Sequence, residues 1–191
     1  MSDYFTDDLI LCNKLGLKDE QVLKNAEEEI VAARMVEVIE NPVNGSYDFD
    51  MLKKIHRKLF SDIYEFAGEV RTVRIAKDNS VFCYPEFIEE YQNNIFEKLK
   101  QQNYLTALPK ETFIRRFSEL SGELNALHPF REGNGRTIRI FLKHLAEHAG
   151  WYVAYEDMQA EELLNADIKS FEGDLAPLMK LLAKHVFEYK E

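Results

Sequence analysis

A short glycine-containing loop that begins at His128 constrains this chain most, because long helical patterns lie on both sides of it. Before the loop, apolar residues recur every three or four positions, as on one face of a helix, and they are Phe113, Phe117, Leu120, Leu124 and Leu127. Pro129 ends that helix, because a proline pushes the preceding residue out of the α region. The second pattern continues through Ile138, Phe141, Leu142 and Leu145. The segment therefore predicts a helix, a tight turn and the N-terminus of a new helix.

Most of the remaining chain also has helical periodicity, interrupted by turn residues. Helices are expected from Lys18 to Asn41, from about Asp48 to Ile63, from Pro85 onward, and over residues 110–127, 134–149, 157–170 and 174–189. Residues 69–84 differ, because β-forming side chains flank a turn-rich tetrapeptide at 77–80 and predict a short hairpin. A lone hairpin is marginal in water, so it must lie on a helical body. The predicted fold class is all-α with one small β-hairpin.

The N-terminal part carries two weaker expectations. The residues before Lys18 hold few periodic signals, so we expect a loosely ordered lead-in. In the helix that follows, the expected apolar stripe consists of Val22, Ala26, Ile30 and Ala33, with Val31 and Met35 beside it. The run Glu27-Glu28-Glu29 is interpreted as a solvated helix face without a binding role, as short charge runs usually are.

The formal net charge is −10, from 24 Lys and Arg against 34 Asp and Glu. Nucleic-acid binders need a positive face, and anionic membranes attract basic segments, so neither is an expected partner. A bound anion would therefore need a compact local group of donors. Cys12 and Cys83 lack CxxC spacing, which disfavours a disulfide framework or a zinc site and favours a reducing cytoplasm. The sequence shows neither a signal-peptide pattern nor an apolar run of about 20 residues.

The loop after His128 has the properties of a phosphate site. Gly133 and Gly135 allow positive φ and close approach of the backbone, so successive N–H groups can surround an anion. The new helix adds unpaired N–H donors and the positive end of its dipole. Arg136 and Arg139 are three residues apart and so share one helix face, and their guanidinium groups match phosphate oxygens.

Two further residues add chemistry to this segment. Glu132 offers a hard oxygen ligand for Mg²⁺ shared with a polyphosphate, and His128 is of the residue type that most often serves as a general base. Each feature alone is more often structural than functional, but their occurrence together over residues 128–139 favours a phosphate or nucleotide site. The chain has no Walker A sequence, GxxxxGK[ST]. The residues alone leave open which bond is broken.

The segment resembles the signature of the Fic family, HxFx[DE]GNGRxxR. The matching residues are His128, Phe130, Glu132, Gly133, Asn134, Gly135, Arg136 and Arg139. The resemblance is clearest over residues 50–165, and it implies a single Fic domain over 1–191, with an N-terminal helical extension over 1–49 and a C-terminal helix over 166–191. It also implies the Fic fold, a bundle of about seven or eight helices with one β-hairpin, the flap.

The resemblance implies that the chain is a nucleotidyltransferase that moves AMP from ATP to a Tyr, Thr or Ser hydroxyl of a target protein and releases pyrophosphate. His128 would take the proton from that hydroxyl, Phe130 would be a buried anchor for the loop, and Glu132 would hold Mg²⁺ on the α- and β-phosphates. The expected nucleotide-binding residues are Gly133, Asn134 and Gly135 as the anion cradle, Arg136 at the β-phosphate region and Arg139 at the γ-phosphate.

The flap would bind a segment of the target protein by strand-like pairing with its backbone. The flap residues are expected to be Lys77, Asp78, Asn79, Ser80 and Phe82. By analogy with short bacterial toxins of the family, the target would be a subunit of a type II topoisomerase. In a related toxin branch a lysine replaces the second glycine of the loop and a phosphoryl group is transferred, so Gly135 favours AMP transfer.

Members of the family are often inhibited by a helix with the pattern [ST]xxxE[GN], which this sequence lacks. The nearest match runs from Ser61 to Glu65, but Phe66 follows it. We therefore expect a toxin inhibited by a separate small antitoxin, acting in the cytoplasm or, as part of a secreted effector, in a host cell. The alternatives are transfer of another phosphate-containing group (phosphoryl, UMP or phosphocholine) and a non-catalytic phosphate-binding interaction module.

Overall fold

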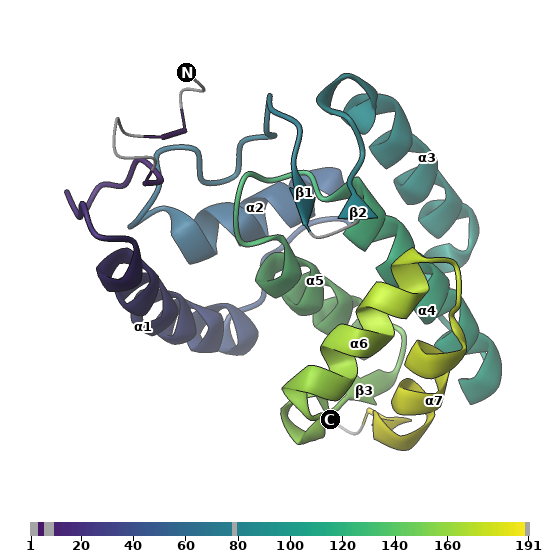
Figure 1. The fold of residues 1–191 in the computed structure, drawn as a ribbon. Coiled ribbons are helices and arrows are strands. Elements are labelled where there is room, and N and C mark those ends of the chain that lie inside the picture. Colours follow the sequence, from purple (N-terminus) through teal and green to yellow (C-terminus); the bar gives the residue numbers. More distant parts are fainter. Residues whose placement is uncertain (1–3, 6–9, 78–79, 190–191) are drawn as a thin grey trace.

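The computed structural model describes residues 4–5, 10–77 and 80–189 (Figure 1). Within these residues the chain forms seven α-helices and two small antiparallel strand pairs, so the predicted mostly helical fold with a hairpin is confirmed. The helices are α1 (Glu20–Glu40), α2 (Phe49–Phe60), α3 (Ile88–Gln101), α4 (Lys110–Leu127), α5 (Asn134–His148), α6 (Ala160–Phe171) and α7 (Ala176–His185). The strands are β1 (Ala76–Lys77), β2 (Ser80–Val81), β3 (Trp151–Val153) and β4 (Val186–Glu188).

Helix α5 lies in the middle of the molecule, with contacts to α1, α2, α4 and β3 (Figure 1). Ile138, Phe141, Leu142 and Leu145 on this helix are at most 2% exposed. A helix that is buried around most of its circumference belongs to the core of the domain. The body of α5 is therefore held by the elements around it, and its first turn, which belongs to the signature segment, starts from this fixed support.

Helix capping sets where α1 and α2 begin. The carboxylate of Asp19 accepts a hydrogen bond from the Val22 amide at 2.9 Å, and Asp48 does the same for Met51 at 2.9 Å. Asp48 is thus the cap of α2. The predicted apolar stripe of α1 was wrong by one position, because Val22 is 49% exposed and the buried residues are Leu23, Glu27, Val31 and Val38. The error arose because a glutamate sits in the middle of the buried stripe.

The segment before α1 is more fixed than predicted. The Lys14 amide donates to the carbonyl of Ile63 at 2.8 Å, and the Cys12 amide donates to the carbonyl of Tyr4 at 2.9 Å. The side chain of Asn13 donates to the carbonyls of Leu11 and Leu17. The Asn13 hydrogen bonds close a local turn, and the Lys14 bond ties this segment to the residues after α2, and hydrophobic periodicity reports neither.

The C-terminal part also differs from the prediction, because residues 166–191 do not form one helix. Helix α6 ends at Phe171, α7 ends at His185, and β4 then pairs with β3 in the register Tyr152↔Phe187. Val186 is fully buried in this pair, so burial of β-forming residues against a distant strand ends the helix earlier than expected. No helix in the described part of the chain has the length and apolar character needed to cross a membrane.

Candidate functional site

The loop of residues 128–133 joins α4 to α5 through two residues with left-handed backbone angles. His128 ends α4 with φ 44° and ψ 59°, and Gly133 begins α5 with φ 78° and ψ 10°. The side chain of Asn134 closes the loop, because its amide donates to the Phe130 carbonyl at 2.8 Å and its oxygen accepts from the Phe130 amide at 2.9 Å. Asn134 is only 3% exposed, so its side chain braces the cradle rather than facing a ligand.

The loop packs tightly on α2. A Cβ atom at Gly133 would lie 2.2 Å from the Cζ atom of Phe60, so both the backbone angle and the available space require glycine there. Gly135 does not use the positive φ that glycine allows, because this residue lies in the first helical turn of α5. A Cβ atom at Gly135 would meet only Arg139 within 4 Å, and Gly135 is exposed. The space in front of this residue is therefore open to an anion.

His56 of α2 packs against the loop and supports it, a role that was not predicted from the sequence. Its ring is fully buried and stacks on Phe130 with the ring centroids 3.9 Å apart. The Gly68 amide donates to Nδ1 at 2.8 Å, so Nε2 carries the proton and donates to the Glu132 carbonyl at 2.9 Å. Burial lowers the pKa of His56 to about 4, which keeps the ring neutral near pH 7. Phe130, itself fully buried, is the anchor that was predicted.

Arg71 holds the loop to the base of the flap, and the sequence analysis missed it as well. Its side chain donates to four backbone carbonyls, and the whole residue is 1% exposed. The acceptors are the carbonyls of His128 at 2.7 Å, Val73 at 2.7 Å, Cys83 at 2.5 Å and Leu127 at 3.5 Å. Burial lowers the pKa of Arg71. No sequence pattern could have revealed this residue, because backbone carbonyls are present at every position.

The flap reaches the loop through Phe82. Its ring stacks on the imidazole of His128, with centroids 3.7 Å apart and an angle of 15° between the rings. The hairpin itself is shorter than predicted, with the register Ala76↔Val81 and Lys77↔Ser80. Of the predicted flap residues, Asp78 and Asn79 lie outside the described part of the chain.

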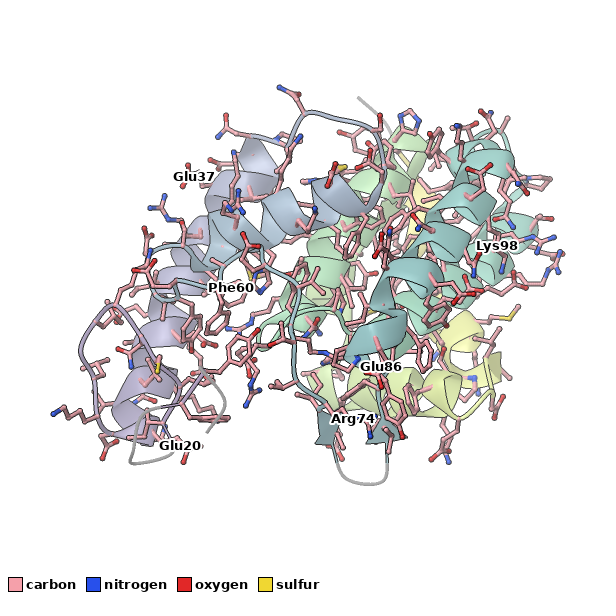
Figure 2. The ribbon with its side chains drawn as sticks, turned by 90° about the horizontal axis from the view of Figure 1, so that it is seen from above. Glu20, Glu37, Phe60, Arg74, Glu86 and Lys98 are labelled. Carbon is pink, nitrogen blue, oxygen red and sulfur yellow. The ribbon has the colours of Figure 1, made fainter. Side chains whose placement is uncertain are left out.

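An ion pair joins the two sides of the flap base. Arg74 precedes β1, and its guanidinium lies 2.9 Å from the carboxylate of Glu86, which follows β2 (Figure 2). Both side chains are at least half exposed. The flap is therefore fixed at its base by the buried Arg71 and only on its surface by this pair.

Glu132 and Arg136 lie together at the start of α5. The carboxylate of Glu132 accepts from the Gly133 amide at 2.8 Å and lies 3.5 Å from Nη2 of Arg136. The guanidinium of Arg136 also covers the ring of Phe60, 4.9 Å from its centroid. The Glu132 side chain is 42% exposed and that of Arg136 is 22% exposed, so ligands can reach both.

Glu27 corrects the expectation of a solvated face on α1. It is 8% exposed, and its two carboxylate oxygens accept hydrogen bonds from Nη2 of Arg136 and from the hydroxyl of Tyr64. Glu28 and Glu29 are exposed, as predicted for the run. No sequence pattern could have revealed this contact, because Glu27 and Arg136 are 109 residues apart.

The two signature arginines face one open cleft of about 580 Å³. Its lining includes Glu27, Tyr64, Glu132, Arg136 and Arg139, so both arginines border the same cleft. Arg139 also borders a small cavity of about 30 Å³ on its other side, beside Gly135 and Asp167. Burial raises the pKa of Asp167 to about 6, although the nearby charge of Arg139 opposes this shift.

The chemistry available in this cleft is that of a polyphosphate site. Two guanidinium groups and the N-terminus of a helix provide donors for anionic oxygens, and Glu132 provides a carboxylate at the rim. The described residues contain no group of three or more His, Cys, Asp or Glu placed to hold a metal ion. One carboxylate suits Mg²⁺ nevertheless, because this ion is usually bound by one or two carboxylates together with substrate phosphates and water.

Comparisons with known proteins point in one direction. Residues 46–146 match the Fic/DOC family. The chain is 39% identical over 180 residues to Protein adenylyltransferase VbhT of Bartonella schoenbuchensis. The matched region covers 94% of this chain but only 38% of that protein. It is 38% identical over 170 residues to a protein of Sinorhizobium fredii named Probable protein adenylyltransferase y4lH, covering 88% of this chain and 87% of the relative.

A solved structure has the same fold over nearly the full length. The N-terminal Fic domain of a VirB-translocated Bep effector protein from Bartonella quintana, with bound ADP, superposes with a TM-score of 0.90. It is 25% identical in sequence, and the match covers 98% of this chain and 95% of that one.

Proposed function

This chain belongs to the Fic/DOC family, and we propose that it is a protein adenylyltransferase that moves AMP from ATP to a hydroxyl group of a target protein. The observation that carries the proposal is that Arg136 and Arg139, in the first two turns of α5, both line one cleft together with Glu132. Relatives named as protein adenylyltransferases, and an ADP-bound structure of the same fold, support it. The chain spans 38% of VbhT, so the proposal concerns this domain and not the longer protein.

The nucleotide phosphates would lie along the start of α5. The backbone amides of residues 133–135 and the positive end of the helix dipole would hold the phosphate nearest the loop. Arg136 would contact the β-phosphate region and Arg139 the γ-phosphate, since both residues line the cleft. Positioning and charge stabilisation would supply most of the rate enhancement.

His128 would act as the general base. Its Nδ1 atom lies 3.2 Å from the carbonyl oxygen of Asn125, and a carbonyl can only accept, so Nδ1 carries the proton. The other ring nitrogen, Nε2, is then the atom that takes a proton from the target hydroxyl. The hydroxyl oxygen forms a bond to the α-phosphorus of ATP, the bond from that phosphorus to the bridging oxygen breaks, and pyrophosphate leaves.

Mg²⁺ would supply positive charge between the α- and β-phosphates. Glu132 is the residue that would hold it, because its carboxylate lies at the cleft rim and its side chain is 42% exposed. Arg136, which lies 3.5 Å from this carboxylate, would hold it near the start of α5 before the ion binds.

We further propose that a separate small antitoxin supplies an inhibitory helix, because the pattern [ST]xxxE[GN] is absent from the sequence. A subunit of a type II topoisomerase is the candidate target, with the flap, including Phe82, binding the target segment. The proposed place of action is the cytoplasm, either of the producing cell or of a host cell. Mass spectrometry of a bacterial lysate treated with the chain tests the target, since modified peptides gain the mass of AMP.

ATP labelled separately at the α- and γ-phosphates tests the reaction itself. Transfer of the α-label to protein supports AMP transfer, whereas transfer of the γ-label alone would establish phosphorylation instead. His128→Ala should abolish transfer while ATP still binds. If the variant transfers AMP at the wild-type rate, the assignment of the general base is wrong. If the wild-type chain binds ATP but transfers neither label to any protein in the lysate, the chain is a binding module.

A further inference from the structure

Glu27 of α1 forms an ion pair with Arg136 of the signature segment. One carboxylate oxygen accepts from Nη2 of Arg136, and the other accepts from the hydroxyl of Tyr64. The side chain of Glu27 is 10% exposed, and Tyr64 is 1% exposed. A buried carboxylate is costly unless it is paired and hydrogen-bonded, and both conditions are met here. Glu27 is thus held in place from both sides.

The guanidinium of Arg136 is fixed by groups from three parts of the chain. Glu27 of α1 binds its Nη2 atom, Phe60 at the end of α2 lies under its plane, and Glu132 of the loop lies 3.5 Å from the same Nη2. An arginine side chain carries five N–H donors on a planar fork. Both carboxylates use one nitrogen, so neither of them occupies Nε or Nη1 of the fork.

The two carboxylates around Arg136 differ in their freedom to move. Glu132 is 42% exposed and sits at the longer distance, whereas Glu27 is 10% exposed and is also bound by Tyr64. Arrival of a metal ion and a polyphosphate can therefore turn Glu132 away from Arg136 without disturbing Glu27. The guanidinium would keep one fixed partner throughout.

We infer that Glu27 is a positioning residue that holds Arg136 in the orientation needed to bind the nucleotide phosphates, with Tyr64 holding Glu27. This inference rests on the proposed function, because it assigns the phosphate contact to Arg136. It makes α1, which precedes the matched family region of residues 46–146, a functional part of the nucleotide site.

A double-mutant cycle measured by ATP binding tests the inference. The dissociation constant of ATP would be determined by calorimetry for the wild type, Glu27→Ala, Arg136→Ala and the double variant. We expect Glu27→Ala to weaken binding about tenfold in the wild-type background, which corresponds to about 1.4 kcal/mol, and less than about twofold in the Arg136→Ala background. Glu29→Ala is the matched control, since Glu29 is an exposed glutamate on the same helix.

Three results would overturn the inference. An equal loss in both backgrounds would show that Glu27 acts on the fold rather than through Arg136. Unchanged binding in Glu27→Ala would remove any role in the site. Tighter binding would mean that the carboxylate opposes the phosphates. A wild-type chain that binds no ATP would instead refute the proposed function, so the two failures are distinguishable.

Two milder variants guard against loss of folding in Glu27→Ala. Glu27→Gln keeps the shape and one acceptor for Arg136, and we expect it to bind ATP more tightly than Glu27→Ala. Tyr64→Phe removes only the hydroxyl that orients Glu27, and we expect about a threefold loss that again disappears in the Arg136→Ala background. If Tyr64→Phe and Glu27→Gln both bind ATP as the wild type does, with the fold intact, the positioning role is refuted.

Discussion

Arg71 and Arg136 lie on different sides of the same loop and are held in opposite ways. Arg71 is 1% exposed and donates to four backbone carbonyls, including that of His128. The Arg136 side chain is 22% exposed and lies against the carboxylates of Glu27 and Glu132. The difference separates an arginine that holds the backbone of the site in place from an arginine that faces the cleft.

The two sets of partners explain the two roles. Backbone carbonyls cannot move away without unfolding the loop, so the hydrogen bonds of Arg71 are permanent. Side-chain carboxylates at the edge of a cleft can exchange with phosphate oxygens, which are acceptors of the same kind. The part of the site around His128, the proposed general base, is therefore fixed by the fold. Around Arg136, the proposed phosphate contact, the carboxylate partners can give way to a ligand.

Of the four substitutions, replacing Arg71 should lower the free energy of unfolding most. Arg71→Ala leaves four carbonyls without their donor in the interior, and we expect the free energy of unfolding to fall by about 3–5 kcal/mol. Denaturant unfolding followed by circular dichroism measures this change. Arg71→Lys is the control, and it should recover only part of the loss, because an ammonium group cannot reproduce the planar fork. A loss below about 1 kcal/mol in Arg71→Ala would contradict the permanent role.

Replacing Arg136 should give the opposite balance of effects. We expect Arg136→Ala to weaken ATP binding about 10- to 100-fold, since one charged contact to the phosphates is lost. It should cost less stability than Arg71→Ala, because Glu132 is 42% exposed to water and the buried Glu27 keeps its hydrogen bond from Tyr64. Calorimetry and denaturant unfolding on the same samples give both numbers. A larger stability loss than in Arg71→Ala would reverse the comparison.

His56 is a further fixed support of the loop, and unlike Arg71 it carries no charge near pH 7. Its folded pKa of about 4 lies below the ordinary value of 6.5, so the unfolded chain binds more protons between these values and stability falls as the pH falls. From this group alone we expect a loss of about 2 kcal/mol between pH 7.5 and pH 5. Unfolding at both pH values, compared with His56→Gln, measures it. A His56→Gln variant with the same pH dependence as the wild type would exclude this histidine as the cause.

The exposed pair Arg74–Glu86 should give the smallest effect. Its side chains are 64% and 50% exposed, and surface ion pairs of this kind contribute little. We expect the melting temperature of Arg74→Ala to equal that of the wild type within error, in contrast to Arg71→Ala three residues earlier. Differential scanning calorimetry at low and high salt tests this. A clear drop in the melting temperature of Arg74→Ala, matched by a drop in the wild type at high salt, would show that the surface pair stabilises the base of the flap.

The sequence predicted what depends on local rules. Pro129 and the glycines after it fixed the helix–loop–helix, and the Fic family and the mostly helical fold are confirmed. The roles given to His128, Glu132 and the signature arginines remain predictions. What was missed depends on contacts between distant positions: Glu27 is 109 residues from Arg136, and β4 pairs with β3 across two helices. Arg71 was missed because carbonyl partners leave no mark in a sequence.

The Phe82 ring that covers one face of the His128 imidazole bears on the direction of the proposed proton transfer. A stacked ring leaves the in-plane nitrogens of an imidazole uncovered, so a hydroxyl can still approach Nε2 along the edge of the ring. The stack restricts rotation of the imidazole about its side-chain bonds. Phe82 would therefore set the plane in which the base accepts a proton, and the target hydroxyl would have to approach in that plane.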